Sequence, residues 1–312
     1  MRVPEKFRGS GAAFDQWKQG TSPRSRLYHN NGDGTFTDVS AGSGLDHTGW
    51  GMGVCVGDYD NDGFDDLYVT YYGGNVLYHN NGNGTFTEVA YRAGLGEVGW
   101  LFTTFGAKFL DYDNDGWKDI MLADGQVFPQ IDRYQTGITY AERNLLFHNR
   151  GDGTFDEVGL QSGPGFALRK VSRGLATADY DNDGDLEILV SNMNGAPDLL
   201  RHLRKNPNHS ILVKTIGSKS NRDGIGAEVK VTAGSLTQYD TVRSGGSYLS
   251  SSDLRLHFGL GNRTTIDRLE VRWPSGETQK IENPPVDRIL VIKEGEGLVA
   301  TQPLRKAGVS AK

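Results

Sequence analysis

Two short motifs recur three times each in this sequence, always in the same order, and no other feature limits the possible fold so strongly. The first motif, Leu-Tyr-His-Asn-Asn-Gly-(Asp/Asn)-Gly-Thr-Phe with one variant copy, ends at Phe36, Phe86 and Phe155. The second motif, Asp-Tyr-Asp-Asn-Asp-Gly, begins at Asp58, Asp111 and Asp179. Such self-similarity is typical of arrays that stack one supersecondary unit on the next. The chain is therefore expected to contain about three copies of one unit.

Each acidic motif lies between two short apolar stretches, such as residues 54–56 and 67–69 around the first copy. A strand, a tight turn and a second strand form a hairpin. The Gly-rich first motif supplies residues that tolerate positive φ, which predicts a second hairpin. Two hairpins give a four-stranded unit of about 50 residues, the size of a propeller blade. We therefore expect an all-β fold with a partial β-propeller of about three blades.

Composition supports this class and also indicates where the repeats end. Glycine accounts for 43 of 312 residues, which suits a chain dense in turns. Past residue 206 the acidic motifs stop and short alternating strands begin, typical of a small β-sandwich or barrel. The domain prediction is an N-terminal segment 1–26, propeller blades over 27–205 with an insertion at 124–143, a β domain over 206–297 and a frayed tail over 298–312.

The acidic loops carry the clearest chemistry in the sequence. Positions 1, 3, 5 and 9 of each loop are acidic, position 6 is glycine, and position 7 offers a backbone carbonyl. The expected metal ligands are Asp58, Asp60, Asp62, Phe64, Asp66, Asp111, Asp113, Asp115, Trp117, Asp119, Asp179, Asp181, Asp183, Asp185 and Glu187. Carboxylates this close repel one another unless a hard cation lies among them, and oxygen-only ligation favours Ca²⁺ over zinc or copper. We expect about three Ca²⁺ per chain, one for each blade.

Three alternatives to a Ca²⁺ site of this kind exist for the loops. The first is a set of solvated acidic turns without metal, and Mg²⁺ is the second, although Mg²⁺ keeps more of its water. The third is an EF-hand, whose loop continues to a bidentate Glu at position 12. That position is here occupied by Val69, Leu122 and Val190, which lie in the expected strands. The EF-hand is excluded by these apolar residues.

Charge and apolar content exclude several classes of partner. The formal net charge is −6, whereas nucleic acids and anionic membranes need basic stripes. The sequence contains no apolar run of about 20 residues, so no membrane insertion is expected. The opening residues 1–6 do not resemble a signal peptide. The single cysteine, Cys55, lies in an apolar run and is expected to be buried.

Some further residues were considered as functional candidates. The recurring His29, His79 and His148 are interpreted as part of the repeat pattern, and His257 as structural. Residues 247–252 are interpreted as a polar loop rather than a nucleophile site. The segment 221–223 with Arg243 is expected to pair internally rather than hold an anion. Within the insertion, three aromatic side chains form the best expected ligand-contacting surface: Phe128, Tyr134 and Tyr140.

The two motifs together resemble the FG-GAP/VCBS repeat of integrin-α-type β-propellers. Residues 220–227, 242–248, 257–261 and 271–276 resemble the ASPIC/UnbV domain. The combination is similar to bacterial relatives of the cartilage acidic protein family. This resemblance implies a Ca²⁺-loaded propeller, a C-terminal β domain, and an extracellular or periplasmic location. A propeller of that family would have about seven blades, so we expect self-association or pairing with missing blades.

Two functions follow as hypotheses. The first is a calcium-stabilised interaction module that binds a protein or glycan. The alternative is an enzyme, for example a cyclase, lyase or hydrolase, with a pocket on the propeller face or between the two domains. The sequence contains no Gly-x-Ser-x-Gly elbow, and Gly224-x-Gly226 lacks the third glycine of a dinucleotide fingerprint. The interaction module is therefore the leading hypothesis.

Overall fold

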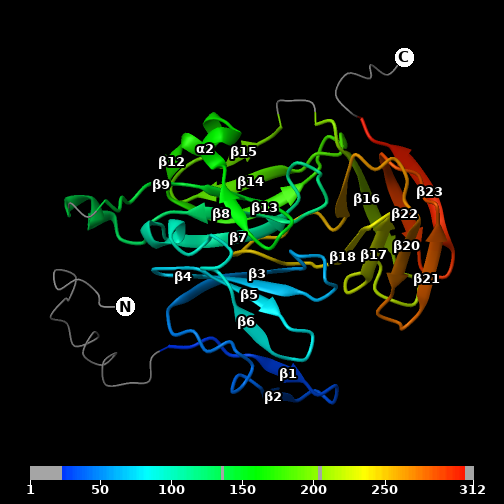
Figure 1. Cartoon of the computed structure of the whole chain (residues 1–312), viewed down its shortest axis with the longest axis horizontal. Coiled ribbons are helices and arrows are strands. Elements are labelled where there is room, and N and C mark those ends of the chain that lie inside the picture. The colour runs from blue at the N-terminus through cyan, green and yellow to red at the C-terminus, as the bar shows by residue number, and fades with distance from the viewer. Residues whose placement is uncertain (1–22, 135–136, 203–205, 306–312) are drawn as a thin grey trace.

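The computed structural model describes residues 23–134, 137–202 and 206–305, and these residues form an array of propeller blades beside a β-sandwich (Figure 1). Most of the expected N-terminal segment, residues 1–22, and the last residues of the expected tail, 306–312, lie outside the described residues. The helical elements are short and lie in the propeller part: η2 (Val98–Leu101), η3 (Pro129–Arg133), α2 (Gly159–Ser162) and η4 (Pro164–Ala167).

Three sheets carry the acidic motifs and form the blades. The first blade has the order β3-β4-β5-β6, with bounds Gly51–Gly57, Asp66–Tyr71, Val76–Asn80 and Phe86–Glu88. The second has the order β7-β8-β10-β11, with bounds Thr104–Leu110, Asp119–Asp124, Leu145–Asn149 and Phe155–Glu157. The third has the order β13-β14-β15, with bounds Ser172–Ala178, Glu187–Asn192 and Asp198–Leu200. Every neighbouring pair of strands is antiparallel, so both expected hairpins are confirmed in the first two blades.

The blades are held together by side chains that are buried between adjacent sheets. Leu77 of the first blade and Ile120 of the second belong to one apolar cluster, and both are fully buried. Met121 of the second blade and Leu175 of the third belong to the next cluster. The expected buried state of Cys55 is confirmed, and burial raises the pKa of its thiol to about 12. Strand alternation thus places one face of each blade against its neighbour.

Two smaller sheets add to the three blades, so the count of sheets in the propeller part exceeds the expectation. The hairpin β1 (Tyr28–Asn30) with β2 (Phe36–Asp38) forms a partial blade before the first full one. The pair β9 (Glu142–Arg143) with β12 (Arg169–Lys170) closes the insertion over 124–143 against the third blade. The propeller is therefore an arc of five sheets, three of which contain an acidic loop.

The C-terminal β domain is a sandwich of two four-stranded sheets. One has the order β19-β16-β22-β23, with bounds Leu256–Gly261, His209–Ile216, Arg288–Lys293 and Gly297–Pro303. The other has the order β18-β17-β20-β21, with bounds Leu236–Thr241, Glu228–Ala233, Arg268–Arg272 and Thr278–Glu282. The core between them includes Phe258 and Trp273. The sandwich predicted beyond residue 206 is present.

The expected frayed tail needs correction over the residues that the structure describes. Strand β23 pairs antiparallel with β22 from Gly297 to Pro303 and forms an edge of the sandwich. Its side chains are mostly exposed, so the segment has no strong apolar pattern. Strand β23 is held instead by backbone hydrogen bonds to the edge of β22. Such bonds do not depend on side-chain type, so the sequence pattern does not predict them.

The sandwich is seated on the end of the blades that carries the acidic loops (Figure 1). A Cβ atom added at Gly63 would lie 3.3 Å from the Tyr239 ring, and one at Gly116 would lie 2.7 Å from Leu236. At Gly184 it would lie 2.7 Å from Ser210 Oγ. Position 6 of all three loops is therefore in close contact with the C-terminal domain, and glycine is the residue that fits there.

Candidate metal centres in the three acidic loops

The first carboxylate of each loop closes the turn. Asp58 accepts hydrogen bonds from the backbone N–H groups of Asp62 and Gly63, at 3.1 and 2.9 Å. Asp111 and Asp179 make the same pair of contacts with positions 5 and 6 of their own loops, at 2.9 to 3.0 Å. All three carboxylates are buried. The same side chain thus folds the backbone of each loop in the same way.

The carboxylate at position 9 ties the loop to its blade. Asp66 accepts hydrogen bonds from the N–H groups of Tyr59 and Asn80, at 3.2 and 2.7 Å. Asp119 does the same with Tyr112 and Asn149, at 3.0 and 2.8 Å. In the third loop, the longer Glu187 accepts from the N–H of Tyr180 at 3.2 Å.

The carboxylate at position 3 differs from the others because one of its oxygens has no partner. The Oδ1 atoms of Asp60, Asp113 and Asp181 are shielded from solvent and receive no hydrogen bond from the residues that the structure describes. A buried polar atom without a partner is costly, and such atoms are rare in folded proteins. The same atom is left unsatisfied in three separate loops, which points to a missing partner common to all three.

The acidic groups lie close enough together to bind one cation. Ligand oxygens converge within 4.8 Å of one another in three sets: Asp58, Asp60 and Asp66; Asp111, Asp113 and Asp115; Asp179, Asp181 and Glu187. Carboxylate oxygens in a tight loop are the ligands that Ca²⁺ prefers. The residues present therefore fit a calcium ion, and the ion would supply charge neutralisation and rigidity there.

The protein groups alone give the clustered carboxylates of the loops an unfavourable electrostatic environment. Burial, together with the neighbouring acids, raises the pKa of Asp66 to about 8 and that of Asp58 to about 6. Burial likewise raises the pKa of Asp119 and Glu187 to about 7. Each group would bind a proton at neutral pH far more readily than a free carboxylate would. A bound divalent cation would remove the same free-energy cost of holding charged carboxylates close together in a buried site.

Not every expected ligand points into its loop. Asp185, expected to contribute its backbone carbonyl at position 7, directs its side chain to Asn114 Nδ2 at 2.7 Å. The position 5 carboxylates of Asp62 and Asp183 accept the N–H of position 7 at 2.9 Å, while Asp62 also lies near a histidine. The position 7 residues Phe64 and Trp117 pack their rings near the turn glycines Gly82 and Gly151 of the following hairpin.

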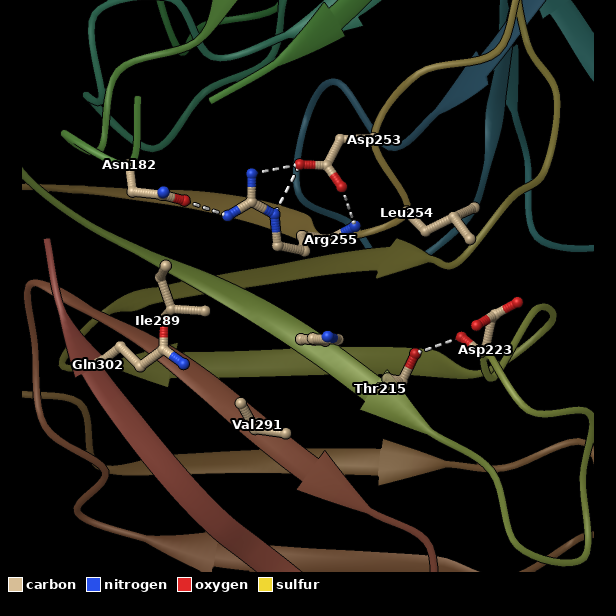
Figure 2. A pocket seen from close by; sticks show the side chains of 10 residues that line it. Asn182, Thr215, Asp223, Asp253, Leu254, Arg255, Ile289, Val291 and Gln302 are labelled. Carbon is tan, nitrogen blue, oxygen red and sulfur yellow. Dashed lines mark hydrogen bonds and ion pairs between the residues drawn. The ribbon is translucent and has the colours of Figure 1, made fainter. Parts of the chain in front are cut away.

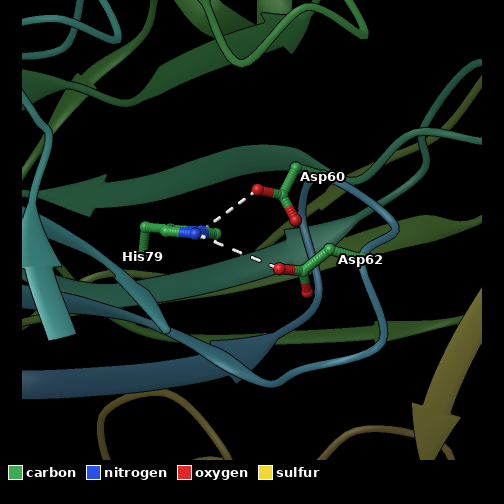
Figure 3. Close-up of side chains that lie close together, drawn as sticks. All are labelled: Asp60, Asp62 and His79. Atoms are coloured by element: carbon green, nitrogen blue, oxygen red, sulfur yellow. Dashed lines mark ion pairs between the residues drawn. The ribbon is translucent and has the colours of Figure 1, made fainter. Parts of the chain in front are cut away.

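A side-chain nitrogen of a histidine or an arginine lies beside the position 3 carboxylate in each loop. The sequence analysis did not predict this contact. His79 Nδ1 lies 3.1 Å from Asp60 Oδ2 (Figure 3), and His148 Nδ1 lies 3.5 Å from Asp113 Oδ2. The third loop has Arg201 in the equivalent place, at 3.0 Å from Asp181. The hydrogen bond to Asp119 is the main cause that raises the pKa of His148 to about 9. The recurrence of His in the first motif was the signal for this contact.

A second missed residue is the asparagine at position 4. Asn61, Asn114 and Asn182 adopt a left-handed backbone conformation with φ of 59°, 60° and 60°. Their side chains leave the loop and contact the next element of the array, as described in the Discussion. The motif itself contained this signal, because Asn is one of the few residues that tolerate this φ.

Comparison with known proteins agrees with this geometry. Residues 19–69, 58–122 and 136–190 match the FG-GAP-like repeat, and residues 217–299 match the ASPIC and UnbV domain. The chain belongs to the FG-GAP-like repeat family. The resemblance inferred from the two motifs is thereby confirmed, as is the all-β propeller fold of an FG-GAP-like protein.

Among curated proteins, this FG-GAP-like chain is similar to cartilage acidic protein 1 of three animals. The Mus musculus protein is 26% identical over 309 residues, which cover 95% of this chain and 46% of the relative. The Homo sapiens protein is 27% identical over 277 residues, covering 86% and 40%. The Xenopus tropicalis protein is 26% identical over 299 residues, covering 91% and 43%. The chain thus spans less than half the length of these relatives.

The remaining candidates of the FG-GAP-like chain have structural partners. Arg222 pairs with Asp223, and Arg243 pairs with Asp240 and Asp65, so the internal pairing expected for this group is confirmed. Ser250 and Ser252 accept hydrogen bonds from the backbone of β13, at 3.0 and 3.1 Å. No helix in the described part of the chain has the length and apolar character needed to cross a membrane.

A cavity of about 360 Å³ lies between the third acidic loop and the sandwich (Figure 2). Its wall includes Asn182 of the loop and Arg255 of the sandwich, joined by a hydrogen bond of 2.5 Å. Asp253 holds the Arg255 guanidinium from the other side at 2.6 Å. These hydrogen bonds among Asn182, Arg255 and Asp253 join the two domains at one wall of the cavity.

Proposed function

We propose that this FG-GAP-like protein is a calcium-stabilised interaction module that acts outside the cytoplasm, in an extracellular or periplasmic setting, and binds a protein or a glycan. One observation carries the calcium part: the same position 3 oxygen is buried and unsatisfied in all three loops. A bound Ca²⁺ supplies the missing partner of each and offsets the repulsion among the acids. The family membership and the similarity to cartilage acidic protein 1 support the interaction part.

In this proposal calcium serves as a structural ion. It fixes three loops on which the sandwich rests, and binding to the folded state alone adds stability by mass action. The side chains of His79 and Arg201 lie beside the position 3 carboxylates, and the Arg201 guanidinium limits the net negative charge of the third loop. A rigid arc and a fixed second domain then present a constant surface to a partner.

Isothermal titration calorimetry on chelator-treated protein tests the calcium part. We expect three Ca²⁺ per chain and a rise in melting temperature as the loops fill. A Mg²⁺ titration under the same conditions is the control and should give a weaker response, because Mg²⁺ demands octahedral geometry and keeps its water. Loops that stay empty at millimolar Ca²⁺ would sink the proposal.

A further inference from the structure

The end of the blades opposite the acidic loops contains two buried acids that the repeat does not explain. Asp124, at the end of β8, is 0% exposed, and Glu142, in β9, is 3% exposed. They begin and end the insertion, which projects away from the sandwich (Figure 1). Asp124 Oδ2 and Glu142 Oε1 are both shielded from solvent, and neither has a hydrogen-bond partner among the described residues.

Comparison with the neighbouring blades shows that no acid is needed at this point of the fold. Asp124 pairs with Thr104 across the sheet, and the same register position is Tyr71 opposite Gly51 in the first blade. In the third blade it is Asn192 opposite Ser172. The backbone therefore accepts Tyr or Asn where the second blade has a buried carboxyl. Among the three blades that carry acidic loops, only the second has a carboxyl at this position, and only one of its two oxygens is used by the pairing with Thr104.

The partners of the two acids use only one oxygen of each. Thr104 Oγ1 donates to Asp124 Oδ1 at 2.5 Å, and the N–H of Thr103 donates to Glu142 Oε2 at 2.8 Å. Burial raises the pKa of Asp124 to about 7 and that of Glu142 to about 8, so both carboxyls carry protons for part of the time at neutral pH. Each group thus offers an acceptor, and in its protonated form a donor, to an incoming hydroxyl.

The cations nearby are already engaged, which argues against an anionic ligand. Arg173 donates to the carbonyls of Gly125 and Gln126, at 2.7 and 3.0 Å, and stacks on the Phe105 ring. Arg143 is held by both oxygens of Glu157 at 2.9 Å. These guanidinium groups also oppose a cationic ligand through their charge.

Exposed aromatic rings lie at the same end. Tyr72, on the turn after β4, is 49% exposed, and the pKa of its hydroxyl is raised, mainly by partial burial and also by the neighbouring Glu142. Within the insertion, Phe128 is 50% exposed and Tyr134 is 45% exposed, as the sequence suggested for a ligand-contacting surface. Flat aromatic faces beside hydrogen-bonding carboxyls suit the apolar faces and hydroxyl groups of a sugar ring.

We propose that Asp124 and Glu142, with the aromatic rings of Tyr72 and the insertion, form a binding site for a neutral glycan. The proposal rests on the interaction module proposed above and names its ligand class and its site. Hydroxyl groups of the glycan donate to Asp124 Oδ2 and Glu142 Oε1, which removes two unsatisfied buried atoms. Both oxygens are shielded from solvent among the described residues, so their exposure to the glycan is part of this proposal.

The test is calorimetry of the full chain in millimolar Ca²⁺ with three neutral oligosaccharides: cellohexaose, laminarihexaose and hexa-N-acetylchitohexaose. We expect saturable binding of at least one, and a loss of affinity of about tenfold or more in Asp124→Asn and in Glu142→Gln. Each variant keeps the oxygen used by Thr104 or Thr103 but replaces the free acceptor with a donor. The melting temperature of each should hold or rise, because a desolvated carboxyl is removed.

Asp156→Asn is the matched control, since Asp156 is an exposed acid of the same blade that pairs with Arg150 at the opposite end. It should bind the oligosaccharide as the parent chain does. Spermidine and a heparin hexasaccharide test the cationic and anionic classes, and binding of either one at this site in preference to the neutral sugars overturns the ligand class. Absence of sugar binding in a sample that still takes up Ca²⁺ overturns this inference and leaves the calcium proposal standing. Unchanged binding in both acid variants overturns the site.

Discussion

The side chain of Asn61 donates a hydrogen bond of 3.0 Å to the backbone carbonyl of Gly116, and so joins the first acidic loop to the second. Asn114 repeats the contact one blade further on, with the carbonyl of Gly184 at 3.2 Å. In the third loop, Asn182 instead accepts from Arg255 of the sandwich at 2.5 Å. The three loops are therefore linked in series, from position 4 of one to position 6 of the next.

Asn61→Gly tests this link without straining the backbone, because glycine tolerates the φ of 59° at this position. We expect a loss of about 1 kcal/mol in the free energy of unfolding, the usual value of one hydrogen bond, plus a few tenths from the added chain entropy. Urea denaturation in the presence of Ca²⁺ measures it. Asn194→Gly is the control, since Asn194 has a φ of 55° on an exposed turn. Equal losses in the two variants would show that the link contributes nothing.

Asp113→Ala removes the unsatisfied position 3 carboxylate from the second loop. We expect the calcium stoichiometry to fall from three to two and the melting temperature in Ca²⁺ to fall with it, because one stabilising ion is lost. In chelator the difference should shrink or reverse, because the variant also removes a charge that raises the pKa of Asp111 and Asp119. A variant with full stability but without an enzymatic turnover seen in the parent chain would make the loop catalytic, against our assignment.

The pH dependence of the metal-free protein follows from the raised pKa values of the loop acids. Asp66 titrates at about 8 and Asp119 at about 7 in the folded state, above the values of about 4 expected for unfolded Asp. The folded state therefore binds protons more tightly, so the stabilisation is fully present below about pH 4 and is lost as the pH rises through 7 to 8. Urea midpoints in chelator should fall from pH 5 to pH 8. In Ca²⁺ this fall should be much smaller, and equal slopes would contradict the calcium assignment.

Self-association of the chain stays a prediction, and we expect it to involve an exposed apolar surface on the third blade. Leu189 and Leu199 are paired across β14 and β15 and are 47% and 51% exposed. Val190, the next residue along β14, is instead fully buried and belongs to the same apolar cluster as Leu175. We expect light scattering at micromolar concentration to show association that Leu189→Lys weakens. Leu249→Lys, at an isolated side chain that is 89% exposed, is the control, and a monomeric parent chain would refute the prediction.

The spacing of the acids predicted much of the candidate metal site because the ligands are local in sequence. Positions 1, 3 and 9 converge within a single turn, so Asp58, Asp60 and Asp66 could be assigned before any tertiary structure was known. The same locality revealed the hairpins and the blades. The spacing of the acids does not show that Asp62, at position 5, accepts the N–H of position 7.

Features that depend on contacts between distant segments were not predictable in this way. The bond from Asn61 to Gly116 joins two different copies of the repeat, and a periodic pattern does not show which residues of neighbouring copies are in contact. The seating of the sandwich on Gly63 and Gly184 depends on the domain arrangement. The burial of Asp124 and Glu142 could not be predicted, because an isolated acid in a polar stretch of sequence looks the same whether it is buried or exposed.

The hydrogen bonds between the loops all run from one loop to the next along the chain, so the two ends of the blade array differ. At its C-terminal end, Asn182 accepts from Arg255 through its side-chain oxygen instead of donating to a further loop, so the sandwich ends the series as a terminal cap does in a repeat protein. At the other end, no described residue donates a hydrogen bond to the carbonyl of Gly63, the group that accepts from asparagine in the later loops. A hairpin with an acidic loop, grafted ahead of β1 to complete the partial blade, can therefore dock by the same contact, whereas a blade inserted after β15 must first displace the sandwich.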